Sequence, residues 1–271
     1  MVEQQVKELL DKEDDGSRRQ GGSGRSRDPL GRFMAMLTAV FDASGNESDQ
    51  SCVTVAGFVS DARQWKEFEA EWKMALGDLP YFRATEHKRI PGLIDRLAAV
   101  IRPRVWRKVS VSLTTNTILL IPSAQWASHN INAYAMCART CVTEVERWAL
   151  YRGYPRDKID YVFAAGDVGA GLLKAAMEQD GLRSPILRYP RDVVIKGRPH
   201  AGLVSLQAAD LFAHVAFDTI RGLRVGEASR LPYPDLDKIY GEPGIITRED
   251  IEHFAEMTEA IRRMGISVTG L

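Results

Sequence analysis

Three aspartates stand at positions where their carboxylates could do chemistry. Asp42 directly follows the mostly apolar run 34–41, and Asp167 follows the apolar run 161–165 at the start of a predicted helix. The carboxyl ends of strands are where α/β sheets build their sites. Asp210 lies inside an almost wholly apolar helix predicted over 203–220. An ionised carboxylate there is costly unless a cation or hydrogen-bond donors compensate it, so we expect Asp210 to have a partner.

Carboxylates that converge at strand ends repel one another, and a divalent cation would compensate that repulsion. Mg²⁺ and Mn²⁺ prefer such oxygen ligands. A pair of these ions about 3.5–4 Å apart can activate water and stabilise the leaving oxygen of a phosphodiester. We therefore predict that Asp42, Asp167 and Asp210 are catalytic residues and ligands of Mg²⁺ or Mn²⁺. Three structural alternatives stay open: Asp42 caps its turn, Asp167 caps its helix, and Asp210 pairs with a buried arginine.

Two further residues could take part in acid–base chemistry. His214 follows Asp210 by four residues and so shares its helix face. We predict a catalytic role for it, as an acid–base group beside the metal or as a hydrogen-bonded orienter, against ordinary packing in the helix. Glu86 could supply another acid, against a plain role in a surface loop.

Two segments could contact phosphate. Lys196, Arg198 and His200 precede the Asp210 helix and are the local candidates for phosphate contacts, against a plain basic loop. The glycine-rich run 166–171 could cradle phosphate at a helix N-terminus. It fits neither the dinucleotide fingerprint nor the P-loop, so it is a weak nucleotide signature.

Nucleophilic hydrolysis and cysteine-based sites have little support. The sequence holds no Gly-x-Ser-x-Gly elbow and no His-x-x-x-His pair. Cys52, Cys137 and Cys141 are too few for a structural zinc site and include no Cys-x-x-Cys pair, so we expect buried free thiols.

The elements that must position these residues alternate between helix and strand. A β-hairpin comes first, so we expect a mixed sheet with an antiparallel start and a parallel remainder, covered by helices on both faces. The predicted strands or extended segments cover 34–41, 52–59, 105–115, 159–165 and 186–195, and 80–89 is a loop or short strand. The predicted helices run from Asp61 to Gly77 and over 93–101, 131–151, 172–180, 203–220 and 247–264.

Composition restricts the class of protein. The chain has 271 residues, 45% hydrophobic and 27% charged, and its 36 basic and 36 acidic residues give zero formal net charge. These are values of an ordinary globular protein, and bulk charge identifies no partner. No stretch approaches the ~18 uncharged apolar residues that span a bilayer, so we expect no membrane association. The start of the chain lacks the pattern of a secretory signal, so the expected location is cytoplasmic.

Two motifs resemble the DUF3800 family. The first is Phe41-Asp42-Ala43-Ser44-Gly45-Asn46 followed by Val55-Ala56-Gly57-Phe58-Val59, and the second is the segment 205–213, Ser-Leu-Gln-Ala-Ala-Asp-Leu-Phe-Ala. The resemblance spans about residues 36–221. It implies a ribonuclease H-like fold, metal-dependent nuclease chemistry, and metal-binding roles for Asp42, Asp210 and, less directly, Asp167.

The chain departs from the family pattern at several acids. Ala43 stands where the family commonly has Glu, Ala164 stands where Glu is frequent, and Val215 replaces another acid. Phe82-Arg83 replaces a Phe-His pair. Fewer carboxylate ligands would weaken metal affinity, so the site could be degenerate.

These observations predict an α/β protein with a ribonuclease H-like mixed sheet covered by helices on both faces. The expected parts are a disordered tail over 1–32, a ribonuclease H-like DUF3800-type domain over 33–225, and a C-terminal loop and helix over 226–271 packed on it. The predicted function is a divalent-metal-dependent nuclease that acts on RNA or DNA. The alternatives are a non-catalytic binding module that keeps the fold, and a nucleotide-handling enzyme that uses the glycine-rich run 166–171. The sequence leaves the substrate and the oligomeric state open.

Overall fold

The computed structural model describes residues 36–45, 52–114, 117, 132–167, 169–222, 231–247 and 249–250. All of these residues belong to the one compact unit that spans 35–271. The predicted tail over 1–32 and nearly all of the predicted helix over 247–264 lie outside the described residues.

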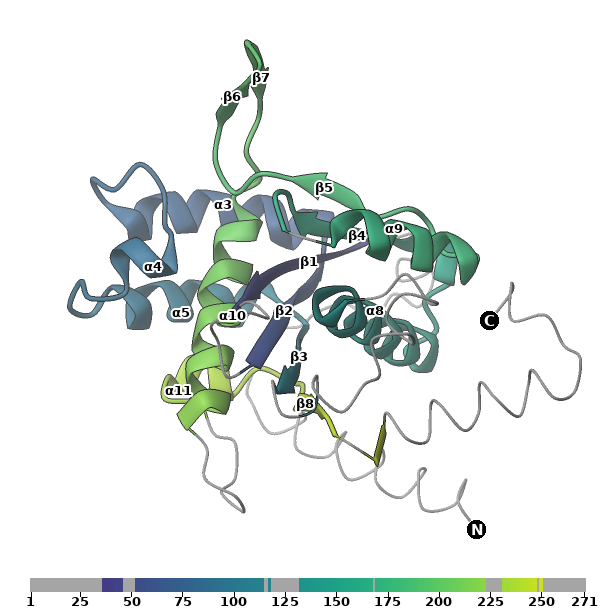
Figure 1. Ribbon diagram of the computed structural model, residues 1–271. Helices are drawn as coiled ribbons and strands as arrows, with labels where there is room; N and C mark the ends of the chain where they lie inside the picture. Colours follow the sequence, from purple (N-terminus) through teal and green to yellow (C-terminus); the bar gives the residue numbers. More distant parts are fainter. Residues whose placement is uncertain are drawn as a thin grey trace, which may run out of the picture. The chain divides into compact units, whose positions relative to one another are not determined.

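A mixed sheet forms the centre of the described fold (Figure 1). Its strand order is β5-β4-β1-β2-β3-β8. β2 is antiparallel to β1 and β3, whereas β1, β4 and β5 run parallel to one another and β8 runs parallel to β3. The strands are β1 (Leu37–Ser44), β2 (Cys52–Asp61), β3 (Arg107–Thr114), β4 (Ile159–Ala164), β5 (Ile186–Arg188) and β8 (Pro243–Ile246).

Alternation along the central strands gives each face of the sheet its own core. Val40 of β1 and Phe58 of β2 belong to one buried cluster, whereas Phe41 and Val55 belong to the other. Successive strand side chains point to opposite faces. A strand covered on both faces needs apolar residues at every position, and this explains the continuous apolar runs in β1 and β2.

One face is covered by α3 (Ala62–Leu76), α5 (Leu93–Arg104) and α10 (Ser205–Gly222), with the short α4 (Ala84–His87) beside them. The predicted limits of α3 are confirmed. The Asp61 side chain accepts a hydrogen bond from the Gln64 N–H, and Gly77 ends the helix at a positive φ of 63°. Its Trp65 and Trp72 are buried, as the helical spacing predicts.

The opposite face is covered by α8 (Ala133–Tyr151) and α9 (Ala170–Gln179) (Figure 1). Asn132 caps α8 by accepting a hydrogen bond from the Ala135 N–H at 2.8 Å. Cys137 and Cys141 face the sheet from α8, and both, like Cys52 in β2, are buried thiols that form no disulfide. The prediction of buried free cysteines is confirmed.

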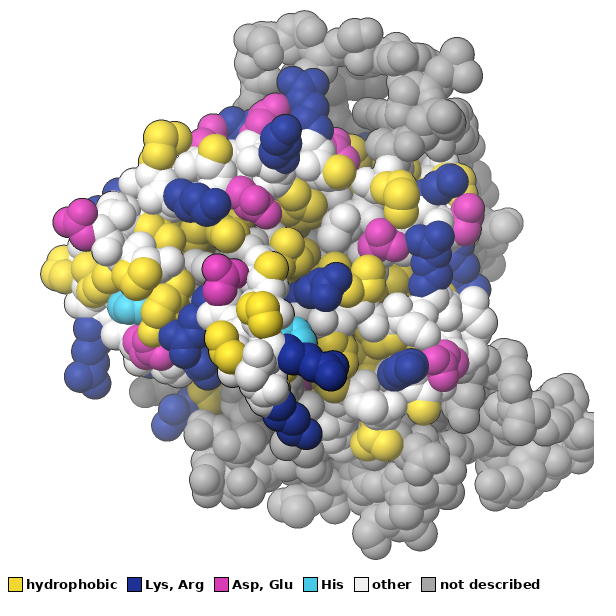
Figure 2. Space-filling model, turned by 90° about the horizontal axis from the view of Figure 1, so that it is seen from above, with side chains coloured by type: hydrophobic (Ala, Val, Ile, Leu, Met, Phe, Trp, Pro, Cys, Tyr) yellow, Lys and Arg dark blue, Asp and Glu magenta, His cyan; other side chains and the backbone are white. Residues whose placement is uncertain are grey.

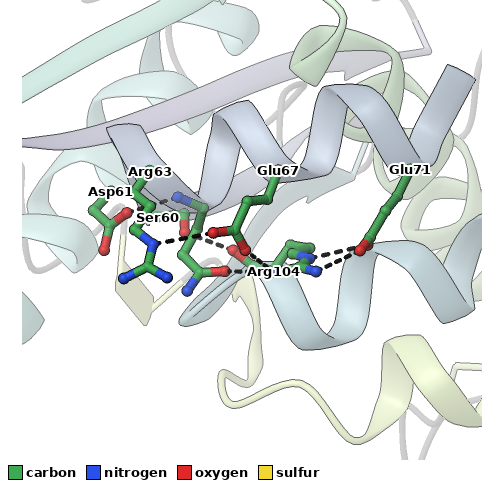
Figure 3. Close-up of polar contacts among 7 residues, drawn as sticks. Ser60, Asp61, Arg63, Glu67, Glu71 and Arg104 are labelled. Carbon is green, nitrogen blue, oxygen red and sulfur yellow. Dashed lines mark hydrogen bonds and ion pairs between the residues drawn. The ribbon is translucent and has the colours of Figure 1, made fainter. Parts of the chain in front are cut away.

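A charged cluster around Arg104 joins the C-terminal end of α5 to α3 (Figure 3). Arg104 donates to both carboxylate oxygens of Glu71 and also to Glu67, while its backbone carbonyl accepts a hydrogen bond from the Ser60 hydroxyl at 2.6 Å. A two-oxygen arginine–carboxylate contact fixes direction as well as distance. The cluster therefore sets how the two helices pack on the sheet.

Two elements differ from the sequence-based expectation. The extended segment predicted over 186–195 contains β5 and then enters a separate two-stranded hairpin, β6 (Val193–Ile195) and β7 (Arg198–His200). The segment predicted as a C-terminal loop contains α11 (Pro234–Asp237) and β8, which adds a parallel strand beyond β3. Both were missed because strands this short carry no measurable period and depend on their pairing partners.

The predicted α/β class is confirmed: the described fold is a mixed sheet that has helices on both faces. Among the helices that the structure describes, none is both long and apolar enough to cross a membrane.

Candidate active site

Strand alternation places Asp42 on the face of the sheet that α10 covers. Asp42 follows Val40 by two residues and pairs across the strands with Ala56, and both of these belong to the core that contains α10 residues. Residues two apart in a strand share a face. Asp42 therefore points toward α10 from near the carboxyl end of β1.

Asp210 reaches the same region from α10. Its Oδ2 accepts a hydrogen bond of 2.6 Å from the Ala84 N–H at the start of α4. The arginine that acts electrostatically on Asp210 is Arg83, which is exposed. The compensation that a carboxylate in an apolar helix requires thus comes from a backbone donor, and the alternative of a buried arginine partner is wrong.

Asp167 approaches from the neighbouring parallel strand. β4 lies beside β1, with Phe163 opposite Phe41, so both strands end at the same edge of the sheet. The N-cap of α9 is Gly169, so the alternative that Asp167 caps the helix is wrong. Within the described residues, the buried Oδ2 of Asp167 has no hydrogen-bond partner. A lone buried carboxylate oxygen is costly, and a ligand with positive charge would compensate it.

The pKa values of these carboxyls show that they share one electrostatic environment. Burial raises the pKa of Asp42 well above its usual value, and the charges of Asp210 and Asp167 raise that pKa further. Burial raises the pKa of Asp167 to about 6 and also raises that of Asp210. The structure thus brings the three predicted acids within electrostatic range of one another.

Arg83 is a residue of this site that the sequence analysis did not single out. Its positive charge lowers the pKa of Asp42, Asp167 and Asp210 alike, so it lies within range of all three. The sequence holds one signal for it, because Arg83 stands where the family resemblance has a histidine. An exposed arginine beside buried acids could meet an anionic substrate at the mouth of the site.

Gln207 explains how the segment before α4 is held over the acids. Its side-chain oxygen accepts hydrogen bonds from the Trp72 indole N–H at 3.0 Å and from the Phe82 N–H at 2.8 Å, and its amide nitrogen donates to the Pro190 carbonyl at 2.8 Å. Gln207 is buried and lies three residues before Asp210, nearly one helical turn. It therefore ties α3, the segment before α4 and the chain before β6 to the helix that carries Asp210.

The hydroxyl oxygen of Tyr134 is a second buried polar atom near the acids. The Tyr134 hydroxyl makes no hydrogen bond within the described part of the chain. Burial raises its pKa, and the charges of Asp167 and Asp42 raise it further. Tyr134 lies on the buried, apolar face of α8, so its hydroxyl carries no separate signal in the sequence.

His214 and Glu86 lie in different surroundings. The Nε2 atom of His214 is 2.9 Å from the Lys88 Nζ and 3.1 Å from an Asp218 carboxylate oxygen. Burial lowers the pKa of His214, the Asp218 charge raises it, and the Lys88 charge lowers it. Glu86 is exposed and accepts a 2.6 Å hydrogen bond from the Tyr81 hydroxyl. A catalytic role for either residue stays a prediction.

The glycine-rich run after β4 has a structural explanation. Gly169 has a φ of 110°, and a Cβ atom there would lie 2.3 Å from the Asn132 side chain that caps α8. Only glycine fits this close contact. Any larger side chain at position 169 would therefore disrupt the α8 cap.

The three carboxylates are of the right chemical type to bind a hard cation, but they are not already arranged around one. Carboxylate oxygens are the ligands that Mg²⁺ and Mn²⁺ prefer, and the lone Oδ2 of Asp167 is one such oxygen. Across the residues that the structure describes, however, no three His, Cys, Asp or Glu side chains are grouped so that they could hold a metal ion. Mg²⁺ usually keeps several waters and binds through one or two carboxylates plus substrate phosphates, so a closed protein cage is not required.

No family model matches the chain, and a search of curated proteins also gave no match. Similar solved structures include Bst-RNase HIII in complex with Mn²⁺ (15% identity, 74% of this chain and 57% of that chain, TM-score 0.39). They also include the RNase HII of a PCNA complex from Archaeoglobus fulgidus (14% identity, 87% and 93%, TM-score 0.40). A third is ribonuclease H2 from Pyrococcus horikoshii OT3 (16% identity, 85% and 89%, TM-score 0.37).

The chain spans 57% of the length of the ribonuclease HIII that it matches. At 14–16% identity, these neighbours assign no role to any residue of this chain.

Proposed function

We propose that this protein is a divalent-metal-dependent nuclease that hydrolyses phosphodiester bonds in RNA or DNA, with Asp42, Asp167 and Asp210 as ligands of Mg²⁺ or Mn²⁺. The observation that carries the proposal is the placement of Asp42: it lies on the sheet face that α10 covers, its strand runs beside the strand that leads to Asp167, and the charges of Asp210 and Asp167 both raise its pKa. Membership of the DUF3800 family is part of the same proposal and rests on the two motifs that surround Asp42 and Asp210.

Each element contributes one carboxylate to the proposed metal site. β1 supplies Asp42, the turn after β4 supplies Asp167, and α10 supplies Asp210. A divalent cation held there would neutralise the repulsion among the acids and stabilise the charge that develops on a phosphodiester. The lone Oδ2 of Asp167 and the raised pKa of Asp42 are the features that such a cation would relieve.

Residues around the acids would bind and orient the substrate. Arg83 is exposed and near all three carboxylates, so its guanidinium would contact a phosphate that enters the site. Gln207 and Asp210 hold the backbone on either side of Arg83 through the N–H groups of Phe82 and Ala84. His214 is proposed as an orienting group, with Lys88 and Asp218 as its contacts.

The proposal predicts that Asp42→Asn abolishes metal-dependent cleavage while the protein remains folded. The substitution keeps the side-chain volume and removes the charge that a cation needs. Cleavage of labelled RNA, DNA and an RNA–DNA hybrid with Mn²⁺ or Mg²⁺ should fall by roughly 100-fold or more. Thermal stabilisation by Mn²⁺, measured without substrate, should also disappear.

Asp157→Asn is the matched control because Asp157 is an exposed aspartate in the short 3-10 helix Arg156–Lys158. It should cleave, and respond to Mn²⁺, like the wild type. Equal cleavage by the wild-type and Asp42→Asn proteins would remove the assignment.

A second candidate function is a non-catalytic binding module. It is favoured by the absence of a ready metal-holding group among the described side chains, and by Ala43 and Ala164 at positions where acids would add ligands. In this case Arg83 would supply the positive charge that offsets the acids. Metal-independent capture of a nucleic acid by both the wild-type and Asp42→Asn proteins, without turnover by either, would support it.

A further inference from the structure

The β6–β7 hairpin is a two-stranded ribbon that projects from the sheet and its helices (Figure 1). The strands pair antiparallel, with Ile195 opposite Arg198, and a two-residue turn of Lys196 and Gly197 joins them. Both turn residues have positive φ, 48° and 76°. Positive φ at both positions defines the type I′ turn, whose twist matches that of a hairpin.

The hairpin and its flanks concentrate positive charge in a chain of zero net charge. Residues 188–200 contain Arg188, Arg191, Lys196 and Arg198 against a single acid, Asp192. Asp192 is occupied by the Gly202 N–H, which donates to its carboxylate at 2.7 Å. Figure 2 looks down on this side of the molecule, where Lys and Arg side chains gather around the projecting chain.

The cations at the end of the hairpin are exposed and without acidic partners. Lys196 and Arg198 are exposed, and no carboxylate of the described residues forms an ion pair with either. Lysine is also an unfavourable residue for the first position of this turn, where Asn-Gly is preferred. Its positive φ costs conformational free energy that asparagine would largely avoid. Lys196 thus places a positive charge at the tip of the hairpin, at a position where asparagine would stabilise the turn more.

The root of the hairpin is fixed to the helix that carries the acid site. The Pro190 carbonyl accepts the hydrogen bond from Gln207, three residues before Asp210 on α10. The Arg191 guanidinium lies 4.2 Å from the centre of the Tyr81 ring, two residues before Arg83. The root of the hairpin is therefore attached beside the acid site, since both contacts lie next to residues that face the acids.

A hollow of about 380 Å³ lies at the same root, between β5 and β7. Its lining includes Arg188, Tyr189 and His200, and the two rings meet edge to face at 5.8 Å. This volume falls within the ~300–1,000 Å³ of ordinary small-ligand sites. The exposed Arg188 side chain in this lining adds a further cation at the root of the hairpin.

We propose that the β6–β7 hairpin is an accessory binding arm that holds the sugar-phosphate backbone of a nucleic-acid duplex beside the acid site, with Lys196 and Arg198 as phosphate contacts. A two-stranded ribbon has the width of a duplex groove, and exposed cations on it would face the phosphates that border the groove. The inference names the substrate-binding element of the proposed nuclease and so rests on that function.

Two substitutions test the arm in the full-length protein. Lys196→Asn removes the charge and supplies the residue that a type I′ turn prefers, so the free energy of unfolding should stay equal or rise. Arg198→Gln removes a second charge from β7. Binding of a fluorescein-labelled DNA duplex, followed by anisotropy in EDTA, should weaken about five- to tenfold at low salt for each variant. The slope of log K against log salt should become shallower by about 0.9 for each charge removed.

Lys238→Asn is the control of equal charge. Lys238 is exposed at the end of α11, far from the hairpin in Figure 1. It should leave the affinity and the salt slope unchanged. Wild-type affinity in both hairpin variants, an equal loss in Lys238→Asn, or no duplex binding by the wild type would each overturn the proposal.

The binding assay also separates this inference from the nuclease proposal. No divalent metal is bound in EDTA, so duplex binding measured there reports on the arm and cleavage measured with Mn²⁺ reports on the acid site. Cleavage that survives Asp42→Asn would reject the nuclease site and leave the arm standing. Loss of cleavage in Asp42→Asn, together with wild-type duplex affinity in both hairpin variants, would reject the arm alone.

Discussion

At the scale of single residues, the candidate site contains acids whose neutral form is favoured by burial. Nearby hydrogen-bond donors and Arg83 offset the cost of burying their negative charges only in part. Asp42 accepts one backbone hydrogen bond, from the Ala43 N–H at 2.8 Å, yet its pKa remains raised. Asp167 has one oxygen without any donor among the described residues. Such frustrated groups are common at functional sites, where a ligand completes the interactions that the fold leaves unmade.

His214 permits a pH test at the same scale. Its imidazole faces Lys88 and Asp218, and burial together with the Lys88 charge lowers its pKa. A histidine whose pKa is lower in the folded state takes up its proton first in the unfolded chain. Its contribution to stability is therefore present above pH ~6.5 and is lost as the pH falls below that value.

We expect the free energy of unfolding of the wild type to fall more steeply between pH 7.5 and 5.5 than that of His214→Gln. The glutamine side chain of the variant does not titrate in this range. Urea unfolding at several pH values measures the difference. Parallel pH profiles for the two proteins would show that the fold does not disfavour protonation of His214.

At the scale of elements, buried polar groups decide how helices and loops meet. The Arg104 cluster joins α3 to α5, and Gln207 joins α10 to α3, to the segment before α4 and to the base of the hairpin. Both are polar groups inside or beside an apolar core, and each has its hydrogen bonds satisfied. Such networks fix one arrangement because any other leaves buried groups unpaired.

Gln207→Leu should destabilise the protein by about 2–4 kcal/mol, because the Phe82 N–H, the Trp72 indole N–H and the Pro190 carbonyl would lose their shared partner. Urea unfolding measures this loss. Gln64→Leu is a suitable comparison, since the partly exposed Gln64 side chain accepts only a 3.3 Å contact from Arg104, and it should cost under about 1 kcal/mol. Equal costs for the two substitutions would contradict the role given to Gln207.

At the scale of the whole described fold, the last edge strand of the sheet comes from a segment late in the chain. β8 pairs with β3, and the buried Lys108 of β3 donates from Nζ to the carbonyls of Leu236 and Asp237 at 3.0 and 2.9 Å. Burial lowers the pKa of Lys108, and the charges of Asp237 and Glu242 raise it. The two carbonyls therefore anchor α11 to the sheet through one lysine.

Lys108→Met should lower the free energy of unfolding by about 1–3 kcal/mol, since two carbonyl acceptors would lose their donor. Limited proteolysis should then cut first within 231–247, because that segment loses its anchor. Lys66→Met, on the exposed side of α3, should change neither measurement. Unchanged protease resistance of 231–247 in Lys108→Met would contradict the anchoring role.

Elements with a strong repeating pattern, and the acids attached to them, could be predicted from the sequence. Helices α3, α8 and α10 and strands β1, β2 and β4 follow from apolar spacing, because burial of one face is recorded locally in the chain. The α/β class follows from their order. Asp42, Asp167 and Asp210 were identifiable because each interrupts or ends an apolar run.

The residues that surround these acids could not be predicted, because they come from distant parts of the chain. Arg83, Tyr134 and Gln207 reach the site through contacts between residues far apart in the chain, such as the 2.6 Å bond from the Ala84 N–H to Asp210. The hairpin arm and β8 likewise depend on pairing partners rather than on their own few residues. Short strands and lone polar side chains carry little local signal, because their free energy comes from neighbours that the sequence order does not reveal.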